Sequence, residues 1–167
     1  ITVIGGGAAG LMAAIAAAER GAQVSLIEPN ERLGKKVNIT GKGRCNVTND
    51  TDLEGLMAHI PRNGRFLYSA LSRFTSRDTM AFFEGCGVPL KVERGDRVFP
   101  VSDSAFNITD ALKGKVKALC IRWIHDRAAA VETAEGHVTA VTGEKGSYPA
   151  DAVIIATGGV SYPGTGS

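Results

Sequence analysis

The pattern GxGxxG formed by Gly5, Gly7 and Gly10 constrains the fold of this chain more than any other feature. It follows a β-branched apolar run, 1–4, of the kind that forms a buried parallel strand. It opens an alanine-rich stretch, 8–20, made of strong helix formers. A strand that passes through a glycine turn into a helix predicts the start of a βαβ unit, and hence an α/β fold with a parallel sheet.

The second strand of this unit is expected over 23–28 and ends in an acid, Glu28. In such a unit Gly5 permits the tight turn, Gly7 lets a pyrophosphate approach the backbone, and Gly10 lets the helix pack against the strand. The helix N-terminus attracts phosphates, and a carboxylate at the strand end accepts hydrogen bonds from both hydroxyls of an adenosine ribose. The pattern therefore predicts dinucleotide binding rather than a simple glycine turn. Glu28 disfavours NADP and leaves NAD and FAD open.

The polar stretch 29–49 favours FAD over NAD. A plain NAD dehydrogenase would enter its next helix here, whereas this segment carries glycines, basic residues and hydroxyl or amide side chains. Long ordered loops are usually functional, and this one can offer N–H groups and cations to a pyrophosphate and polar contacts to a flavin. The alternatives are a solvated basic surface loop or a nucleic-acid patch, the latter disfavoured because no aromatics alternate with the basic residues.

A second indication of a flavoprotein lies near the end of the chain. Alternating segments at 128–133 and 137–142, followed by a turn at 143–146, predict an antiparallel three-stranded meander. The apolar strand that follows runs into Ala-Thr-Gly-Gly, 156–159. This order is typical of flavoproteins with two dinucleotide-binding domains, in which the meander is a crossover connection and the Ala-Thr-Gly strand ends at the cofactor.

Composition and charge disfavour several other classes of protein. The formal net charge of +2 is too small to predict binding to nucleic acid or to an anionic membrane surface. The three cysteines, Cys45, Cys86 and Cys120, lack the spacing of a zinc site or a disulfide framework, which favours a cytoplasmic location. No apolar run reaches the roughly 20 residues that span a bilayer. We expect a small-molecule substrate, no nucleic-acid or membrane partner and no metal, with the oligomeric state open.

Apolar residues at helical spacing predict helices over 65–74, over 76–86, starting at Ser76, and over 108–119. Their aromatic side chains are interpreted as core rather than as stacking surfaces for a ligand.

Single candidate residues carry weaker signals. Cys45 has no partner cysteine at redox spacing, so a packing or flavin-contact role is favoured over a nucleophilic one. Tyr162 is a candidate for the active-site face, with a structural turn as the alternative. No catalytic residue is selected.

Residues 41–49, Gly-Lys-Gly-Arg-Cys-Asn-Val-Thr-Asn, preceded by Ile39-Thr40, resemble the TGxGRCNxTN signature of a bacterial flavoprotein family. The members of this family are the NAD(P)/FAD-dependent, aminoacetone-oxidase-like oxidoreductases with two dinucleotide-binding domains. The segments 97–102 and 156–167 also match the family's pattern, and the resemblance covers nearly the whole chain.

The resemblance implies an α/β, FAD/NAD(P)-binding Rossmann-like fold of the glutathione-reductase type, with a parallel central sheet and an antiparallel β-meander crossover. Family members are about twice as long or more, well past single-domain size. We therefore expect residues 1–167 to be an incomplete fragment, the N-terminal FAD-binding portion of a longer protein. The substrate domain and the final cofactor-binding segment are expected outside it. By resemblance, the cofactor-binding residues are Gly5, Gly7, Ala8, Ala9, Gly10, Glu28, Lys36, Thr40, Gly43, Arg44, Cys45, Asn46, Ala128, Ala156, Thr157 and Gly158.

These expectations define an FAD-dependent oxidoreductase that transfers hydride through flavin N5 to or from a small organic substrate, with NAD(P)H as a candidate electron donor. Arg44 or a lysine of the loop is a candidate for stabilising negative charge on the reduced flavin. The alternative from a different class is a redox sensor or scaffold that binds FAD without turnover. A plain NAD-dependent dehydrogenase is disfavoured by the polar loop and by the Ala-Thr-Gly-Gly strand.

Overall fold

The computed structural model describes residues 1–159 and divides the chain into two compact units. The first comprises Ile1–Val37 and the described part of Leu112–Ser167, and the second comprises Asn38–Ala111. The boundary falls within helix α5 (Ala105–Ala118), which begins three residues earlier than the sequence pattern predicts. Among the described residues, the first unit contains two sheets and the second unit contains one. Tyr162, a candidate from the sequence, lies outside the described residues.

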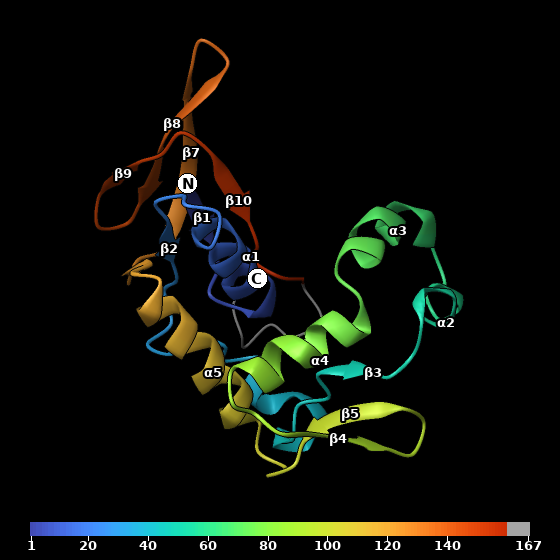
Figure 1. Cartoon of the computed structure of the whole chain (residues 1–167). Helices are drawn as coiled ribbons and strands as arrows, with labels where there is room; N and C mark the ends of the chain where they lie inside the picture. The colour runs from blue at the N-terminus through green and yellow to red at the C-terminus, as the bar shows by residue number, and fades with distance from the viewer. Residues whose placement is uncertain (160–167) are drawn as a thin grey trace. The chain divides into compact units, whose positions relative to one another are not determined.

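The first unit is built on a parallel sheet with the strand order β10-β1-β2-β6 (Figure 1). As predicted, β1 (Thr2–Ile4) leads through helix α1 (Ala8–Ala18) to β2 (Ser25–Ile27). β6 (Arg122–Ile124) pairs with β2, whereas β10 (Val153–Ile155) pairs with the opposite edge of β1. The strand order therefore reverses beside β1, and ligands of open α/β sheets bind at the carboxyl ends of strands at such a reversal.

Side chains of this sheet alternate between two faces that are covered differently. Val3 and Leu26, both fully buried, point to the face against which α1 packs. Ile27 and Ile124 point to the other face and form a buried cluster with Val141 of the meander. The sheet thus lies between a helix and a second, antiparallel sheet.

That second sheet is the predicted meander, with the order β7-β8-β9. It consists of β7 (Ala128–Ala134), β8 (His137–Gly143) and β9 (Ser147–Pro149), and the tip of the β7–β8 hairpin extends beyond the parallel sheet (Figure 1). The pairing of β7 with β8 shifts register between Ala128 and Ala130.

The second unit contains an antiparallel sheet that the sequence pattern does not predict. Its order is β3-β5-β4, with β3 (Thr48–Asn49), β4 (Leu90–Glu93) and β5 (Arg97–Pro100). The polar segment 29–49, expected as a loop, therefore includes β3 and also the 3₁₀ helix η1 (Val37–Gly43), which is kinked over residues 40–42.

Three further helices belong to this unit: α2 (Leu53–Ala58), α3 (Gly64–Arg73) and α4 (Ser76–Gly85). α4 begins at Ser76, as predicted, and Thr75 caps it in a reciprocal box with Asp78.

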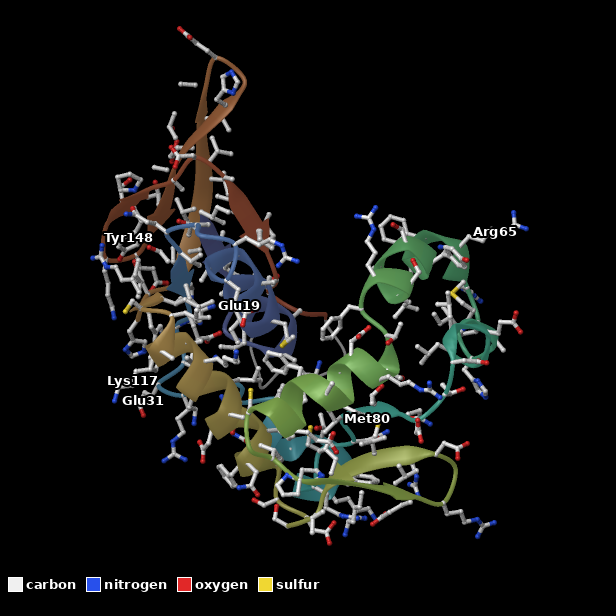
Figure 2. All side chains as sticks on the ribbon, in the orientation of Figure 1. Glu19, Glu31, Arg65, Met80, Lys117 and Tyr148 are labelled. Carbon is white, nitrogen blue, oxygen red and sulfur yellow. The ribbon has the colours of Figure 1, made fainter. Side chains whose placement is uncertain are left out.

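The aromatic side chains of these helices differ in burial. Phe83 of α4 is buried, as expected for core, whereas Phe66 of α3 is 85% exposed, so the core interpretation is wrong for Phe66. Arg65 of the same helix points away from the ribbon (Figure 2). Within residues 1–159, no helix combines the length and the apolar character needed to cross a bilayer.

Candidate functional site

The carboxyl end of β1 turns into α1 through consecutive glycines at 5–7. Gly5 has a φ of +107°, and a Cβ built on it would stand 2.4 Å from the carbonyl oxygen of Ala156. A Cβ on Gly10 would stand 1.8 Å from the carbonyl oxygen of Gly5. A side chain fits at neither position, so the close approach of α1 to β1, and of β1 to the end of β10, depends on these two glycines.

Gly7 is different, because no atom lies within 4 Å of the place where its Cβ would stand. Gly7 is the N-cap residue of α1; no side chain caps this helix, and its first turn contains no acid. The next two residues, Ala8 and Ala9, are exposed. The first N–H groups of a helix have no intrahelical partner. This end of α1 therefore offers N–H donors and a positive dipole end to an anion, with room for it beside Gly7.

Glu28 follows β2 and lies against the glycine turn. It is 7% exposed, and its Oε2 accepts a 2.6 Å hydrogen bond from the backbone N–H of Gly6. A Cβ on Gly6 would stand 2.8 Å from Cγ of Glu28. This carboxylate places an acceptor-only group at the strand end where a ribose is expected, and it would repel a phosphate there.

The Ala-Thr-Gly-Gly turn lies beside the glycine turn at the end of β10. The N–H of Ala156 donates a 2.8 Å hydrogen bond to the carbonyl oxygen of Ile4, the last residue of β1. Thr157 and Gly158 are exposed, and Gly158 has a φ of +90°. The structure thus brings the end of β10 together with the glycine turn and Glu28 at the reversal of strand order.

Lys36 and Ala128 belong to the same unit. Lys36 lies two residues after Gly34, and the N–H of Gly34 donates a 2.8 Å hydrogen bond to the carbonyl oxygen of Gly6. Ala128 is half-buried at the start of β7 and packs against the cluster formed around Ile27. Ala128 therefore lies on the meander side of the sheet.

The other expected residues, Thr40, Gly43, Arg44, Cys45 and Asn46, lie in the second unit. The thiol of Cys45 is 6% exposed, and burial raises its pKa more than the hydrogen bond with Thr40 lowers it. The protonated thiol therefore prevails at neutral pH, which favours packing or contact over nucleophilic chemistry. The left-handed backbone of Cys45, with a φ of +59°, is uncommon for a residue other than glycine.

Arg44 is held by two carboxylates. Its guanidinium lies 2.5 Å from Glu93 and 2.6 Å from Asp103, and its Cζ lies 4.2 Å from the ring centroid of Phe99. The hydrogen bond from Arg44 lowers the pKa of Glu93, and those from Lys91 and Arg44 lower the pKa of Asp103. The charge of Arg44 is thus balanced within the second unit. These partners are far from Arg44 in the sequence, and no local pattern indicates them.

Asn30 is a further residue of the first unit that sequence reasoning missed. Its backbone N–H and its side-chain Nδ2 both donate to Oε1 of Glu28, at 2.8 Å and 2.5 Å. A local signal exists, because a short amide side chain close to a strand end often bonds to its neighbours in the chain.

The fold and this geometry define the class of protein, a Rossmann-like α/β domain for a dinucleotide. The chain belongs to the HI0933-like protein Rossmann domain family, whose family model matches residues 1–167. This is a family of FAD-binding oxidoreductases, and the chain is therefore the Rossmann FAD-binding domain of a flavin oxidoreductase family.

Two curated bacterial proteins are similar to the chain. The 3-dehydro-bile acid Δ(4,6)-reductase of Clostridium scindens is 36% identical over 171 residues, which cover 100% of this chain and 41% of the relative. The ribosomal RNA dihydrouridine synthase of Escherichia coli is 32% identical over 170 residues, which cover 99% of this chain and 40% of the relative. The chain thus spans about two fifths of the length of these relatives.

Solved structures share the fold at lower identity. The 3-ketosteroid-Δ4-(5α)-dehydrogenase of Rhodococcus jostii RHA1, in complex with 4-androstene-3,17-dione, matches 94% of this chain and 45% of its own, with a TM-score of 0.71 and 18% identity. The Sdh1 complex of Mycobacterium smegmatis matches 95% of this chain and 34% of its own, with a TM-score of 0.69 and 21% identity. The predicted Rossmann-like FAD-binding fold with a parallel central sheet is confirmed.

Proposed function

We propose that this chain holds the adenosine diphosphate half of FAD in an oxidoreductase that moves a hydride to or from a small organic substrate. The observation that carries the proposal is the open backbone at Gly7, beside an uncapped helix and at the reversal of strand order. An anion is the ligand that such a helix start favours, and FAD brings a pyrophosphate.

The donor and acceptor groups present fit FAD better than NADP. The N–H groups of the exposed residues Ala8 and Ala9 suit the pyrophosphate, and the carboxylate of Glu28 suits ribose hydroxyls. A 2′-phosphate at that position would face the same carboxylate and be repelled. When bound, FAD supplies a ring nitrogen, N5, that takes up or gives a hydride.

The positions of individual residues support the roles proposed for them. The backbone of 7–10 binds and orients the pyrophosphate, Glu28 binds the ribose, and 156–158 cover the cofactor from the end of β10. The family resemblance supports a contact with the cofactor for Lys36, Thr40, Gly43, Arg44, Cys45, Asn46 and Ala128. This contact stays a prediction.

The curated relatives support a chemical class of substrate. One is named as a reductase of a Δ(4,6) bile acid and the other as a synthase of dihydrouridine. Both names denote the saturation of a carbon–carbon double bond. We therefore propose that the protein reduces a carbon–carbon double bond in a small molecule, with NAD(P)H as the electron donor, in the cytoplasm and without a membrane partner.

The experiment uses the full-length protein that carries this chain. Its visible spectrum and the cofactor released on denaturation are measured first, and a flavin spectrum with released FAD supports the proposal. A colourless protein that does not quench the fluorescence of added FAD contradicts it.

Anaerobic NADH or NADPH is then added, followed by a small unsaturated carbonyl compound or a uridine-containing RNA. Bleaching that is reversed by the unsaturated compound supports the proposed reductase. Reversal by the RNA alone contradicts the small-molecule substrate. Bound FAD that neither donor bleaches and no substrate reoxidises supports the alternative, a sensor or scaffold.

A further inference from the structure

The carboxylate of Glu28 is largely occupied by hydrogen bonds from the protein itself. Its Oε2 accepts from the N–H of Gly6 at 2.6 Å, and its Oε1 accepts from the N–H and Nδ2 of Asn30 at 2.8 Å and 2.5 Å. An ionised carboxylate has about four acceptor sites. Three are used, so Glu28 has one site left, on Oε2.

One acceptor site does not satisfy two ribose hydroxyls. Each hydroxyl of the adenosine ribose donates one hydrogen bond. The sequence-based expectation that Glu28 alone accepts both of them would require Asn30 to release Oε1. A second acceptor beside Glu28 removes that requirement.

The side chain of Asn30 has such an acceptor. Its Nδ2 faces the carboxylate of Glu28, which can only accept, and its Oδ1 faces the ammonium of Lys35, which can only donate. These partners determine which atom of the Asn30 amide is the nitrogen and which is the oxygen. The contact with Lys35 is long, at 3.3 Å, and Oδ1 has two lone pairs, so Oδ1 can accept a further hydrogen bond.

The position of Asn30 is fixed by the backbone around it. The N–H of Gly34 donates a 2.8 Å hydrogen bond to the carbonyl oxygen of Gly6, so the segment after β2 folds back onto the glycine turn. Leu33 is buried there, and a Cβ on Gly6 would stand 2.6 Å from its Cδ2. Asn30 lies within this segment and is held to Glu28 through its main chain as well as its side chain.

We propose that Asn30 is a second ribose-binding residue of the FAD site. Oε2 of Glu28 accepts from one hydroxyl of the adenosine ribose, and Oδ1 of Asn30 accepts from the other. The inference rests on the function proposed above, since it assigns a further contact to the same cofactor.

The test combines substitutions with modified cofactors. Dissociation constants are measured by quenching of flavin fluorescence for FAD, for 2′-deoxyadenosine FAD and for 3′-deoxyadenosine FAD, on the full-length protein and on Asn30→Ala. Loss of either hydroxyl weakens binding to the unsubstituted protein by about fivefold, the effect of one hydrogen bond. Asn30→Ala weakens FAD by about fivefold and abolishes the effect of one hydroxyl while keeping the effect of the other.

Three results would overturn the assignment. The first is that Asn30→Ala binds FAD as tightly as the unsubstituted protein does. The second is that this variant keeps both hydroxyl effects. The third is that it loses both of them, as expected for a residue that only positions Glu28. Lys35→Ala is the matched control and should change the affinity for all three cofactors by the same factor.

Further measurements separate the remaining causes. If the unsubstituted protein does not bind FAD, the proposed function fails and this inference with it; if it binds FAD, the three results above affect this inference alone. Thermal unfolding without cofactor checks the fold of Asn30→Ala. If that variant does not fold, Asn30→Ser replaces it and is expected to lose the same single hydroxyl effect.

Discussion

The hydroxyl of Tyr148, which Figure 2 labels, donates a 2.7 Å hydrogen bond to Oδ2 of Asp126 and so joins the last strand of the meander to the segment just after β6. Asp126 is 1% exposed and also accepts from the backbone N–H groups of Arg127 and Lys145. A Cβ on Gly143 would stand 2.1 Å from the same carboxylate. This buried acid therefore connects β6 with the turn between β8 and β9.

We predict that Tyr148→Phe lowers stability near neutral pH more than in acid. Burial raises the pKa of Asp126, but the hydrogen bonds from Tyr148 and then from the N–H groups of Lys145 and Arg127 outweigh it and lower the pKa. A carboxyl whose pKa is lower in the folded state stabilises the fold fully above about pH 4, its unfolded pKa, and loses this effect as pH falls through the folded pKa. Urea unfolding at several pH values measures the difference, which should shrink below pH 4.

Tyr68→Phe is the control for this prediction, because Tyr68 is exposed on α3 in the other unit. It should leave the urea midpoint unchanged at every pH. A Tyr148→Phe effect of the same size at neutral and acid pH would show that the carboxylate does not carry it.

Gly10→Ala should lower the stability of the fold, whereas Gly7→Ala should lower the affinity for FAD. A methyl group on Gly10 meets the carbonyl oxygen of Gly5, so this variant should lose about 1–3 kcal/mol of unfolding free energy or more. A methyl group on Gly7 meets nothing, and the φ of −79° suits alanine, so stability should stay within about 0.5 kcal/mol. Gly7→Ala should instead weaken FAD by about tenfold or more, since the methyl group takes the space proposed for the pyrophosphate.

Chemical unfolding and flavin fluorescence measure the two effects separately. Gly7→Ala that binds FAD with unchanged affinity would contradict the assignment of the pyrophosphate to this turn.

We predict that Arg44→Gln lowers the thermal midpoint by a few degrees and leaves the potential of the bound flavin close to that of the unsubstituted protein. The reason is that Glu93 and Asp103 already balance the charge of Arg44. In the variant these two carboxylates lose one of their two cationic partners and keep Lys91. The prediction opposes the sequence-based hypothesis that Arg44 stabilises negative charge on the flavin.

Arg97→Gln is a suitable control, because Arg97 also lies near Phe99, with its Cζ 5.8 Å from the ring centroid. Its effect on the thermal midpoint should be smaller. An unchanged midpoint for Arg44→Gln combined with a shifted flavin potential would restore the original hypothesis.

Cysteine labelling should distinguish Cys45 from Cys120. The thiol of Cys45 is buried with a raised pKa, whereas Cys120 is exposed. Iodoacetamide at neutral pH should therefore modify Cys120 and leave Cys45 intact until the protein is unfolded. Mass spectrometry of peptides measures both rates, and equal rates in the folded protein would contradict the protected thiol.

The elements that can be predicted from the sequence are those with a local period. The β1-α1-β2 unit has its own glycine turn and apolar runs, and the meander has alternating residues with turns between them. Glu28 was found because its distance from the glycine turn is set by one helix and one strand.

The elements that were missed depend on contacts between distant residues. β3 has two residues and exists only because it pairs with β5, where Thr48 lies opposite Val98. The charge partners of Arg44 come from β4 and from the turn before α5. Neither relationship has a sequence period, because tertiary contacts and not propensity define it.

The pairing of β1 with β10 has a consequence for synthesis on the ribosome. Thr2 lies opposite Val153, so β1 waits until β10 has been synthesised before its second edge is paired. At ordinary translation rates this delay is roughly 8–30 s. During that time β1 has an open edge toward β10, and the turn that receives the pyrophosphate lacks its neighbour at Ala156. Cofactor capture should therefore follow the synthesis of β10.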